Sequence, residues 1–304
     1  MSHKELQHIS LVVNPSAGSG RAERLLPRVA DQIHASMPQA VLDVRRSTSY
    51  SDAEHLCADA VAQGTGALLV MGGDGMAHIG LNACATTEIP LGVIPAGTGN
   101  DFCRGVGIPR RVGPAVRAAI SGRTRRIDLT ELVRADGSVE FVGSVVSTGY
   151  DARVNRRTNS VSSSFGPFSN LAYAGVALAE LATFRPLTYR LEIDGMRHEQ
   201  EAMFVAVANA GFFGGGMQVC PAAHVDDGLL DLVVANPMSR GTLLKLLPRI
   251  FSGNHVSHPA VEQLRATRVT IDGDGLFAMA DGEEMGPVPV EAVCRPGALS
   301  VFTA

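Results

Sequence analysis

The sequence predicts an α/β domain at the N-terminus followed by a mostly antiparallel β domain. Short apolar runs alternate with helix-patterned segments through residues 8–126, as in a doubly wound parallel sheet. Beyond residue 126, apolar runs come in pairs around Asp136-Gly137 and Asp194-Gly195, dipeptides that favour hairpin turns. The length of 304 residues suits two domains. We place the first at 1–127 and the second at 128–296.

Each element of the first domain follows from its local pattern. Apolar runs predict strands at 8–15, 40–46, 67–73 and 91–97. Helical spacing and cap residues predict helices at 21–37, 51–64, 76–85 and 100–107. Ligands of such sheets bind at the carboxyl ends of the strands. The segments there are "NPSAGSG", "STSYSD", "GGDG" and "PAGTGND", all rich in glycine or small hydroxyl residues, so we expect one site along this edge.

The second domain is predicted from strand patterns interrupted by two helices. The strand segments are 126–147, 187–210, 228–235, 265–283 and 298–304, and the helices lie near 171–184 and 242–251. No Pro/Ser-rich linker marks the boundary, so we expect the two domains to pack closely.

Composition excludes several classes of protein. The net charge of −4 argues against nonspecific binding of nucleic acid. No run of 18 apolar residues is present, and the polar start "MSHKELQHIS" is no signal peptide. The five cysteines form no CxxC pair, so neither a zinc site nor a disulfide framework is indicated. These features favour a cytoplasmic protein with reduced thiols.

The glycine loops match neither of two common nucleotide motifs. "NPSAGSGRAE" lacks the lysine of a Walker A loop, and Glu23 replaces the last glycine of a dinucleotide fingerprint. Lys4 and Lys245 are the only lysines in the chain. Positive charge for phosphate binding must therefore come from arginine, Mg²⁺ and backbone dipoles.

Asp74 stands alone among the glycines of "GGDG". A carboxylate there would repel phosphate unless a cation intervened, so one reading is that Asp74 meets Mg²⁺ on a nucleotide, directly or through water. The other reading is that Asp74 only caps the helix that begins at Gly75. The residues alone leave both open.

Four motifs in one order carry a resemblance to a known family. "VVNPSAGSG", "GGDGMAHIG", "PLGVIPAGTGNDFCRGVGIP" and "PAAHVDDGLLDL" together resemble the diacylglycerol kinase catalytic family, which includes sphingosine and ceramide kinases. NAD kinase shares a GGDG loop, but "GTGND" and "VDDG" favour the lipid family. The resemblance covers nearly the whole chain. It implies an α/β ATP-binding domain, a β-sandwich-like lipid-substrate domain, and a last strand, about 297–304, that returns to the first domain.

The implied activity is that of a transferase in phospholipid biosynthesis, an ATP-dependent kinase that converts diacylglycerol to phosphatidic acid. Another lipid alcohol, such as a sphingoid base or monoacylglycerol, is an alternative acceptor. A nucleotide- or lipid-binding regulator with weak catalysis is a further alternative, because the central motif is altered. The family usually has Thr, Asn and Glu where this chain has Met76, His78 and Ile79.

The resemblance also assigns site residues by position. Those implied to bind ATP are Asn14, Pro15, Ser16, Ala17, Gly18, Ser47, Gly72, Gly73, Gly75, Thr98 and Asn100. Thr48 is a neighbouring candidate for the role of Ser47. Asp74, Asp281 and Glu283 are the implied catalytic residues, with Glu283 as proton acceptor and Glu284 as its rival by adjacency. Without the family, "DGEE" reads as a solvated turn.

A structural Mg²⁺ site is implied at "HVDDGLL". The family binds this cation with one carboxylate and two main-chain carbonyls, which match Asp227, His224 and Leu229. A tight turn can direct alternate carbonyls at one hard cation. Without the family context, "VDDG" reads as an ordinary hairpin turn.

The lipid substrate requires contact with a membrane. Residues 160–179 carry no charge and follow Arg153, Arg156 and Arg157, so they are a candidate for transient, peripheral contact with the inner face of the membrane. A buried helix that covers the β domain is the alternative. The sequence is compatible with a homodimer but does not determine the oligomeric state.

Overall fold

The computed structural model describes residues 7–150, 152 and 185–303. The predicted helix at 171–184 and the candidate membrane segment at 160–179 lie outside these residues.

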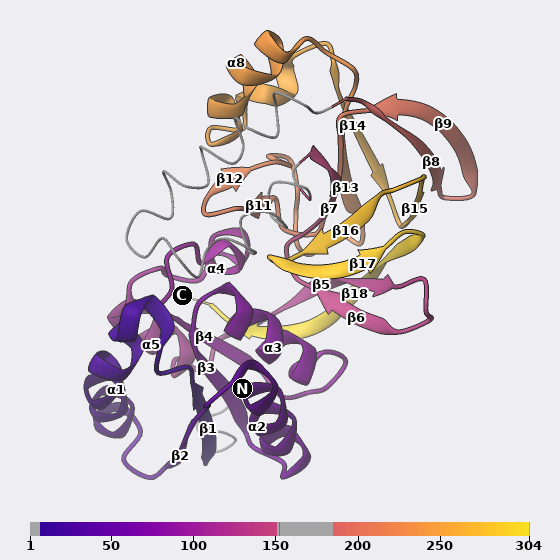
Figure 1. Cartoon of the computed structure of the whole chain (residues 1–304). Coiled ribbons are helices and arrows are strands. Elements are labelled where there is room, and N and C mark those ends of the chain that lie inside the picture. The colour runs from indigo at the N-terminus through magenta and orange to yellow at the C-terminus, as the bar shows by residue number, and fades with distance from the viewer. Residues whose placement is uncertain (1–6, 151, 153–184, 304) are drawn as a thin grey trace.

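The first domain is a parallel sheet with helices on both faces (Figure 1). Its strands lie in the order β2-β1-β3-β4, all as parallel neighbours. Their bounds are β1 (His8–Val13), β2 (Val41–Arg46), β3 (Ala67–Gly72) and β4 (Leu91–Pro95). Strand order reverses direction between β1 and β3, and the crevice outside such a switch point is where open α/β sheets bind ligands.

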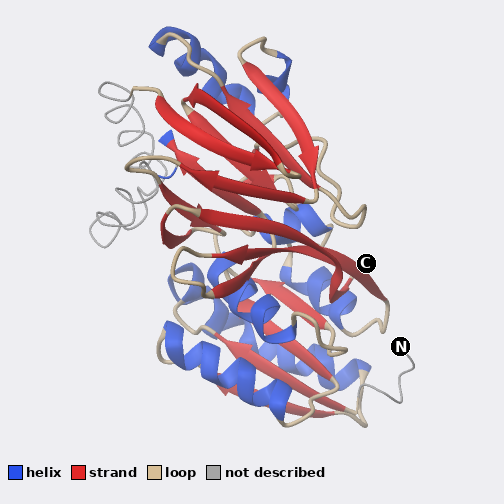
Figure 2. Ribbon diagram, turned by 90° about the vertical axis from the view of Figure 1, so that its right-hand side faces the viewer, coloured by secondary structure: helices blue, strands red, loops and turns tan. Residues whose placement is uncertain are grey.

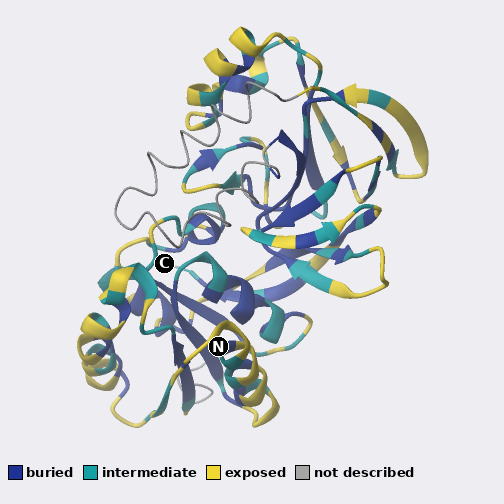
Figure 3. Ribbon diagram, in the orientation of Figure 1, coloured by how far each residue is buried: buried dark blue, intermediate teal, exposed yellow. Residues whose placement is uncertain are grey.

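Alternate residues of the strands face two separate cores. One core receives Val12 and Val70 and lies under α2 (Tyr50–Ala62), α3 (Asp74–Cys84) and α4 (Asp101–Val106). The other receives Leu11 and Leu69 and lies under α1 (Ala17–Ser36) and α5 (Val112–Ala119). Figure 3 shows the strands buried between helices whose outer faces are exposed. Helix α5 was not expected from the sequence.

The second domain is a β-sandwich. One layer continues the first sheet through β18, β15, β8 and β9, with β5 beside β18 and β6 beside β5 (Figure 2). The bounds in this layer are β5 (Thr124–Val133), β6 (Val139–Val142), β8 (Leu187–Ile193), β9 (Met196–Ala202), β15 (Arg268–Asp272) and β18 (Val290–Phe302). A core that includes Tyr189, Val207 and Val269 fills the space between the layers.

The other layer is antiparallel, in the order β14-β13-β10-β7-β16-β17. Its strands are β7 (Val145–Gly149), β10 (Phe204–Ala208), β13 (Leu230–Ala235), β14 (Val261–Ala266), β16 (Phe277–Ala280) and β17 (Glu283–Pro287). Helix α8 (Arg240–Ile250) and the 3-10 turn η3 (Asn254–Ser257) lie at its outer face, where Leu246 packs on Val233. A short hairpin of β11 (Phe212–Phe213) and β12 (Met217–Gln218) lies above α4 in Figure 1.

Strand β18 joins the two domains. Its first half pairs with β15 and β5 of the sandwich, and Val301 near its end pairs in parallel with Leu91 of β4. A continuous strand across the boundary limits relative movement of the domains, because hinge motion would break its ladder of hydrogen bonds.

Candidate active site at the carboxyl edge of the parallel sheet

The glycine loops pack tightly against one another. A Cβ added to Gly97 would lie 2.5 Å from Cα of Gly73, and one added to Gly18 would clash with the carbonyl of Ala96. Gly18 also has φ of 59°, in the left-handed region that favours glycine. These glycines therefore bring the loops after β1, β3 and β4 into contact, which builds one continuous surface from three separate motifs.

The loop after β1 is held by its own side chains. Oδ1 of Asn14 accepts hydrogen bonds from the amide and the hydroxyl of Ser16, at 3.0 and 2.7 Å. Arg24 donates to the carbonyl of Ser19 at 3.1 Å. Asn14 thus shapes this loop, and Arg24 brings a positive charge to a chain that lacks a phosphate-binding lysine.

The other implied ATP contacts differ in exposure. Ser47 is buried, and its hydroxyl donates to the carbonyl of Val13 at 3.2 Å. Thr48 is exposed, and its hydroxyl lies 2.8 Å from Asp52. Thr98 is exposed at the tip of the loop after β4, whereas the side-chain amide of Asn100 donates to the carbonyl of Gly97 at 3.0 Å.

Asp74 caps a helix other than its own. Its carboxylate accepts from the backbone N–H groups of Asn100, Asp101 and Phe102 at 2.7, 2.5 and 3.3 Å. These groups begin α4, whereas the N-cap of α3 is Gly73 without a side-chain bond. The reading that Asp74 caps the helix beginning at Gly75 is therefore wrong. Burial raises the pKa of Asp74, against the opposing effect of the three donors.

Asp101 ties the same loop to the second domain. It is buried, and its Oδ2 accepts from the N–H of Gly215, in the β11–β12 turn, at 2.6 Å. Arg104 lies 3.5 Å from its Oδ1 and donates to the carbonyl of Gly99 at 3.4 Å. The sequence did not single out Asp101, because its partner is more than a hundred residues away.

We expect Asp101 to make the folded protein less stable as pH rises. Burial raises its pKa from 3.8 to about 6, so the folded state favours the neutral acid. The stability that protonation confers is complete below about pH 4 and is lost as pH rises through 6, with a magnitude of roughly 3 kcal/mol. Urea unfolding from pH 4 to 8 tests this expectation. The stability of Asp101→Asn relative to wild type should increase across that range, and parallel curves would contradict the assignment.

Glu283 reaches the first domain from the second. It is the first residue of β17, and a Cβ added to Gly75 would lie 3.6 Å from its Oε1 and 3.7 Å from the ring of Tyr50. Burial and then the Glu283 carboxylate raise the pKa of Tyr50. Glu283 and Glu284 both line an open cleft of about 450 Å³ between the domains, in which Arg134 provides positive charge. Glu284 is the more exposed of the two.

Asp281 lies in the turn between β16 and β17, and its side chain is only 5% exposed. Its carboxylate accepts from the N–H groups of Gly143 and Ser144, both at 2.9 Å, and lies 3.1 Å from Nδ1 of His78. The other ring nitrogen of His78 lies 2.6 Å from Glu140. Asp281 is thus enclosed by protein partners, whereas Glu283 borders the open cleft.

The implied Mg²⁺ site is a turn with an arginine on its carboxylate. Asp227 contacts Arg265 and accepts from the N–H of Leu229 at 3.1 Å, and the side chain of His224 is exposed. Oδ2 of nearby Asp231 is buried without a hydrogen-bond partner among the described residues. Nowhere among the residues that the structure describes do three or more His, Cys, Asp or Glu side chains form a group that could hold a metal ion. Arg265 therefore already occupies the one carboxylate of the implied set, and a cation at this turn would share Asp227 with it.

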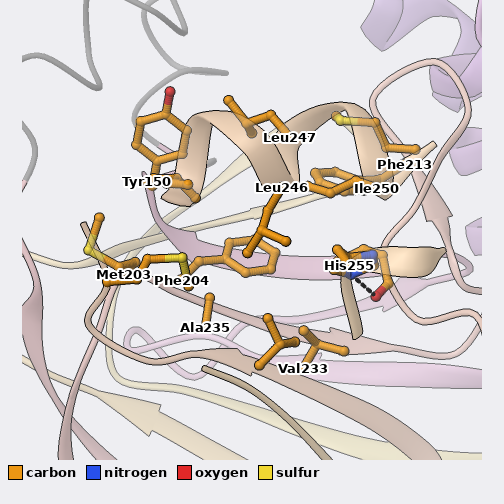
Figure 4. Close-up of a pocket in the computed structure, with 15 residues that line it drawn as sticks. Tyr150, Met203, Phe204, Phe213, Val233, Ala235, Leu246, Leu247, Ile250 and His255 are labelled. Carbon is orange, nitrogen blue, oxygen red and sulfur yellow. Dashed lines mark hydrogen bonds between the residues drawn. The ribbon is translucent and has the colours of Figure 1, made fainter. Parts of the chain in front are cut away.

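An apolar pocket lies between α8 and the outer sheet of the sandwich (Figure 4). Its cavity volume is about 80 Å³. Met203, Phe204 and Leu246 line it, and burial lowers the pKa of His255, whose Nε2 donates to the carbonyl of Val219 at 3.0 Å. The β11–β12 hairpin contributes Phe213 and Met217, so one short element connects this pocket with Asp101.

Comparisons with known proteins agree with the fold and the motifs. Residues 8–132 match the model of the diacylglycerol kinase catalytic domain, and residues 144–303 match the YegS C-terminal NAD kinase beta sandwich-like domain. A diacylglycerol kinase of Mycobacterium tuberculosis is 37% identical over 98% of this chain and 96% of its own. A probable lipid kinase YegS-like of Stenotrophomonas maltophilia is 31% identical over 84% of each chain.

Solved structures share the architecture. One from Bacillus anthracis superposes with a TM-score of 0.81 at 22% identity, covering 99% of this chain and 96% of that one. A diacylglycerol kinase structure from the same organism gives 0.73 at 20% identity, covering 98% and 97%. Within the described residues, no helix is long and apolar enough to cross a bilayer.

Proposed function

The chain belongs to the diacylglycerol kinase catalytic domain family and is a lipid kinase that uses ATP, and from this premise we propose that it phosphorylates diacylglycerol to phosphatidic acid. The observation that carries the proposal is the approach of Glu283 to Gly75. A carboxylate of the lipid-substrate domain lies there against the first turn of the helix that follows a glycine-rich loop. Transfer of phosphate to an alcohol needs this pairing of a phosphate site with a proton acceptor.

The chemistry follows from these positions. The hydroxyl oxygen of diacylglycerol attacks the γ-phosphorus of ATP while Glu283 accepts the hydroxyl proton. The bond from the γ-phosphorus to the bridging oxygen breaks, and ADP leaves. The loops after β1, β3 and β4, together with Arg24 and Arg104, hold the nucleotide phosphates.

Mg²⁺ is the proposed cofactor of the nucleotide. Asp74, Asp101 and Asp281 lie close enough that Asp74 raises the pKa of Asp101 and Asp281 raises the pKa of Asp74. Such a surplus of negative charge favours a divalent cation. Three N–H groups already occupy the Asp74 carboxylate, so we place Asp74 against the cation through water.

The apolar pocket under α8 is the proposed site for an acyl chain. It is lined almost wholly by hydrocarbon and sulfur, and its one histidine is kept neutral by burial. A cavity of about 80 Å³ accommodates the end of a chain. A longer segment requires α8 to move outward.

Transfer from radiolabelled ATP to a panel of lipid alcohols in detergent micelles tests the proposal. The panel contains diacylglycerol, monoacylglycerol, a sphingoid base and ceramide. We expect diacylglycerol to be the preferred acceptor, with Ala235→Phe in the pocket raising the KM for lipid but not for ATP. Leu244→Phe on the exposed side of α8 is the matched control. If the enzyme prefers another alcohol, that alcohol and not diacylglycerol is the substrate. If ATP binds but no phosphate is transferred, the protein is a regulator and not a kinase.

A second prediction concerns the turn at Asp227. We propose that Mg²⁺ binds there with the carbonyls of His224 and Leu229, and that it stabilises the fold. Mg²⁺ without nucleotide should raise the melting temperature of the wild type but not of Asp227→Ala, which should also lose activity. Asp226→Ala is the control, because Asp226 is exposed and faces Arg125. An unchanged Mg²⁺ response in Asp227→Ala would contradict the site.

A further inference from the structure

The altered central motif places a histidine in a row of four polar side chains that runs from the buried Asp281 to the partly exposed Arg134. His78 stands on α3, and its side chain is only 2% exposed. One ring nitrogen faces Asp281 and the other faces Glu140, which in turn contacts Arg134. Carboxylate oxygens only accept hydrogen bonds, so each ring nitrogen of His78 faces an acceptor to which an N–H can donate.

The partner of His78 is the residue that begins the turn before Glu283. Asp281 and Gly282 have φ of 49° and 92° and connect β16 to β17 as a two-residue hairpin turn. Glu283 is the next residue. A tight turn has little freedom, so the position of the Asp281 carboxylate fixes the direction in which the chain leaves toward Glu283.

The contacts of both residues lie on one helix. Gly75 and His78 are three residues apart on α3, a spacing that puts them on the same face. Glu283 approaches the first of them and Asp281 the second. The same helix begins at Asp74, which holds the loop after β4. Helix α3 therefore contacts both the loop after β4, through Asp74, and the turn before Glu283, through His78.

We propose that His78 is a positioning residue for the phosphoryl transfer, acting through its hydrogen bond from Nδ1 to Asp281. The bond sets Glu283 at a fixed place relative to the loops at the start of α3. The bond from Nε2 to Glu140 orients the ring but does not itself place Glu283. This inference rests on the proposed role of Glu283 as proton acceptor.

Two amide substitutions separate the bonds of His78. The side-chain amide of asparagine takes the place of Nδ1, so His78→Asn keeps a donor for Asp281 and loses Glu140. The longer glutamine takes the place of Nε2, so His78→Gln keeps Glu140 and loses Asp281. Ile79→Ala, on the same helix and in the core, is a control for loss of stability alone.

The experiment measures kcat, the KM for ATP and amide hydrogen exchange in each variant. We expect His78→Gln to lower kcat about 10–100-fold, with the KM for ATP within 3-fold, and to speed exchange at Gly143 and Ser144, whose N–H groups bind Asp281. His78→Asn should stay within about 3-fold of wild type in kcat. Ile79→Ala should leave kcat nearly unchanged, and its loss of stability should speed exchange throughout the core around α3 and not selectively at Gly143 and Ser144.

The outcomes distinguish the inference from the proposed function. Equal losses in the Asn and Gln variants would overturn the role of the Asp281 bond. Faster exchange in His78→Gln at wild-type kcat would overturn the role in catalysis. If the wild type transfers phosphate to no lipid alcohol, the proposed function fails, and hydrogen exchange still decides whether His78 holds the turn.

Discussion

Replacing Glu283 by glutamine is expected to lower kcat by roughly 10²–10⁴, the usual contribution of a positioned general base. Glutamine can still hydrogen-bond the acceptor hydroxyl but cannot take its proton. The fold and the affinity for ATP should stay close to wild type, because Glu283 borders an open cleft and is not part of a buried network. Turnover at saturating lipid, together with ATP binding, measures both effects.

Glu284→Gln is the adjacent control. Neighbouring residues of an extended strand point to opposite faces, so only one of the two glutamates can face Gly75. A crippled Glu284→Gln beside an active Glu283→Gln would show that the proton acceptor is misassigned by one residue. If neither variant loses turnover, positioning and Mg²⁺ alone would have to support the transfer, as a loose phosphoryl-transfer transition state permits.

Replacing Asp74 by asparagine is expected to reduce both stability and activity. Asparagine has one acceptor oxygen, whereas the Asp74 carboxylate serves three backbone N–H groups with two. The new NH₂ group would face a donor, and a buried donor without a partner costs about 1–3 kcal/mol. The start of α4 should loosen, which displaces Asn100 and weakens the binding of ATP.

Urea unfolding and ATP titration check this prediction, each at low and high Mg²⁺. Asp101→Asn is the matched comparison, because the N–H of Gly215 binds one oxygen of Asp101, and the amide oxygen of asparagine can keep that bond. Wild-type stability in Asp74→Asn, with activity recovered by excess Mg²⁺, would mean that Asp74 serves the cation and not the loop.

The carboxyl edge of the sheet was predictable because it depends on local patterns. Apolar runs with turns predicted the parallel strands, and parallel strands bring their carboxyl ends to one side of a sheet. The motifs at 14–18, 72–75 and 98–100 therefore had to be neighbours. The family resemblance added the expected roles of Glu283 and Asp227, which the bare segments "DGEE" and "VDDG" do not indicate.

The details within that edge were not predictable. The sequence showed that these loops are rich in glycine, but not that Gly18 and Gly97 let the loops pack on each other. It offered Asp74 as the cap of its own helix, and the structure makes it the cap of α4. The hydrogen-bond partners of Asp74 depend on how loops from different strands pack together. The spacing of residues along the chain does not reveal that packing.

By itself, the sequence determined the α/β domain, the β-rich domain after it, and the family, because periodicity and ordered motifs are local properties. Only the tertiary structure decided which groups act together. The strand β18 spans both domains, Glu283 meets Gly75, and His78 joins Asp281 to Glu140. The physical reason is that a catalytic constellation is a set of distances between residues far apart in sequence. Those distances are fixed by the packing of one sheet, its helices and the sandwich, and not by any one of these segments.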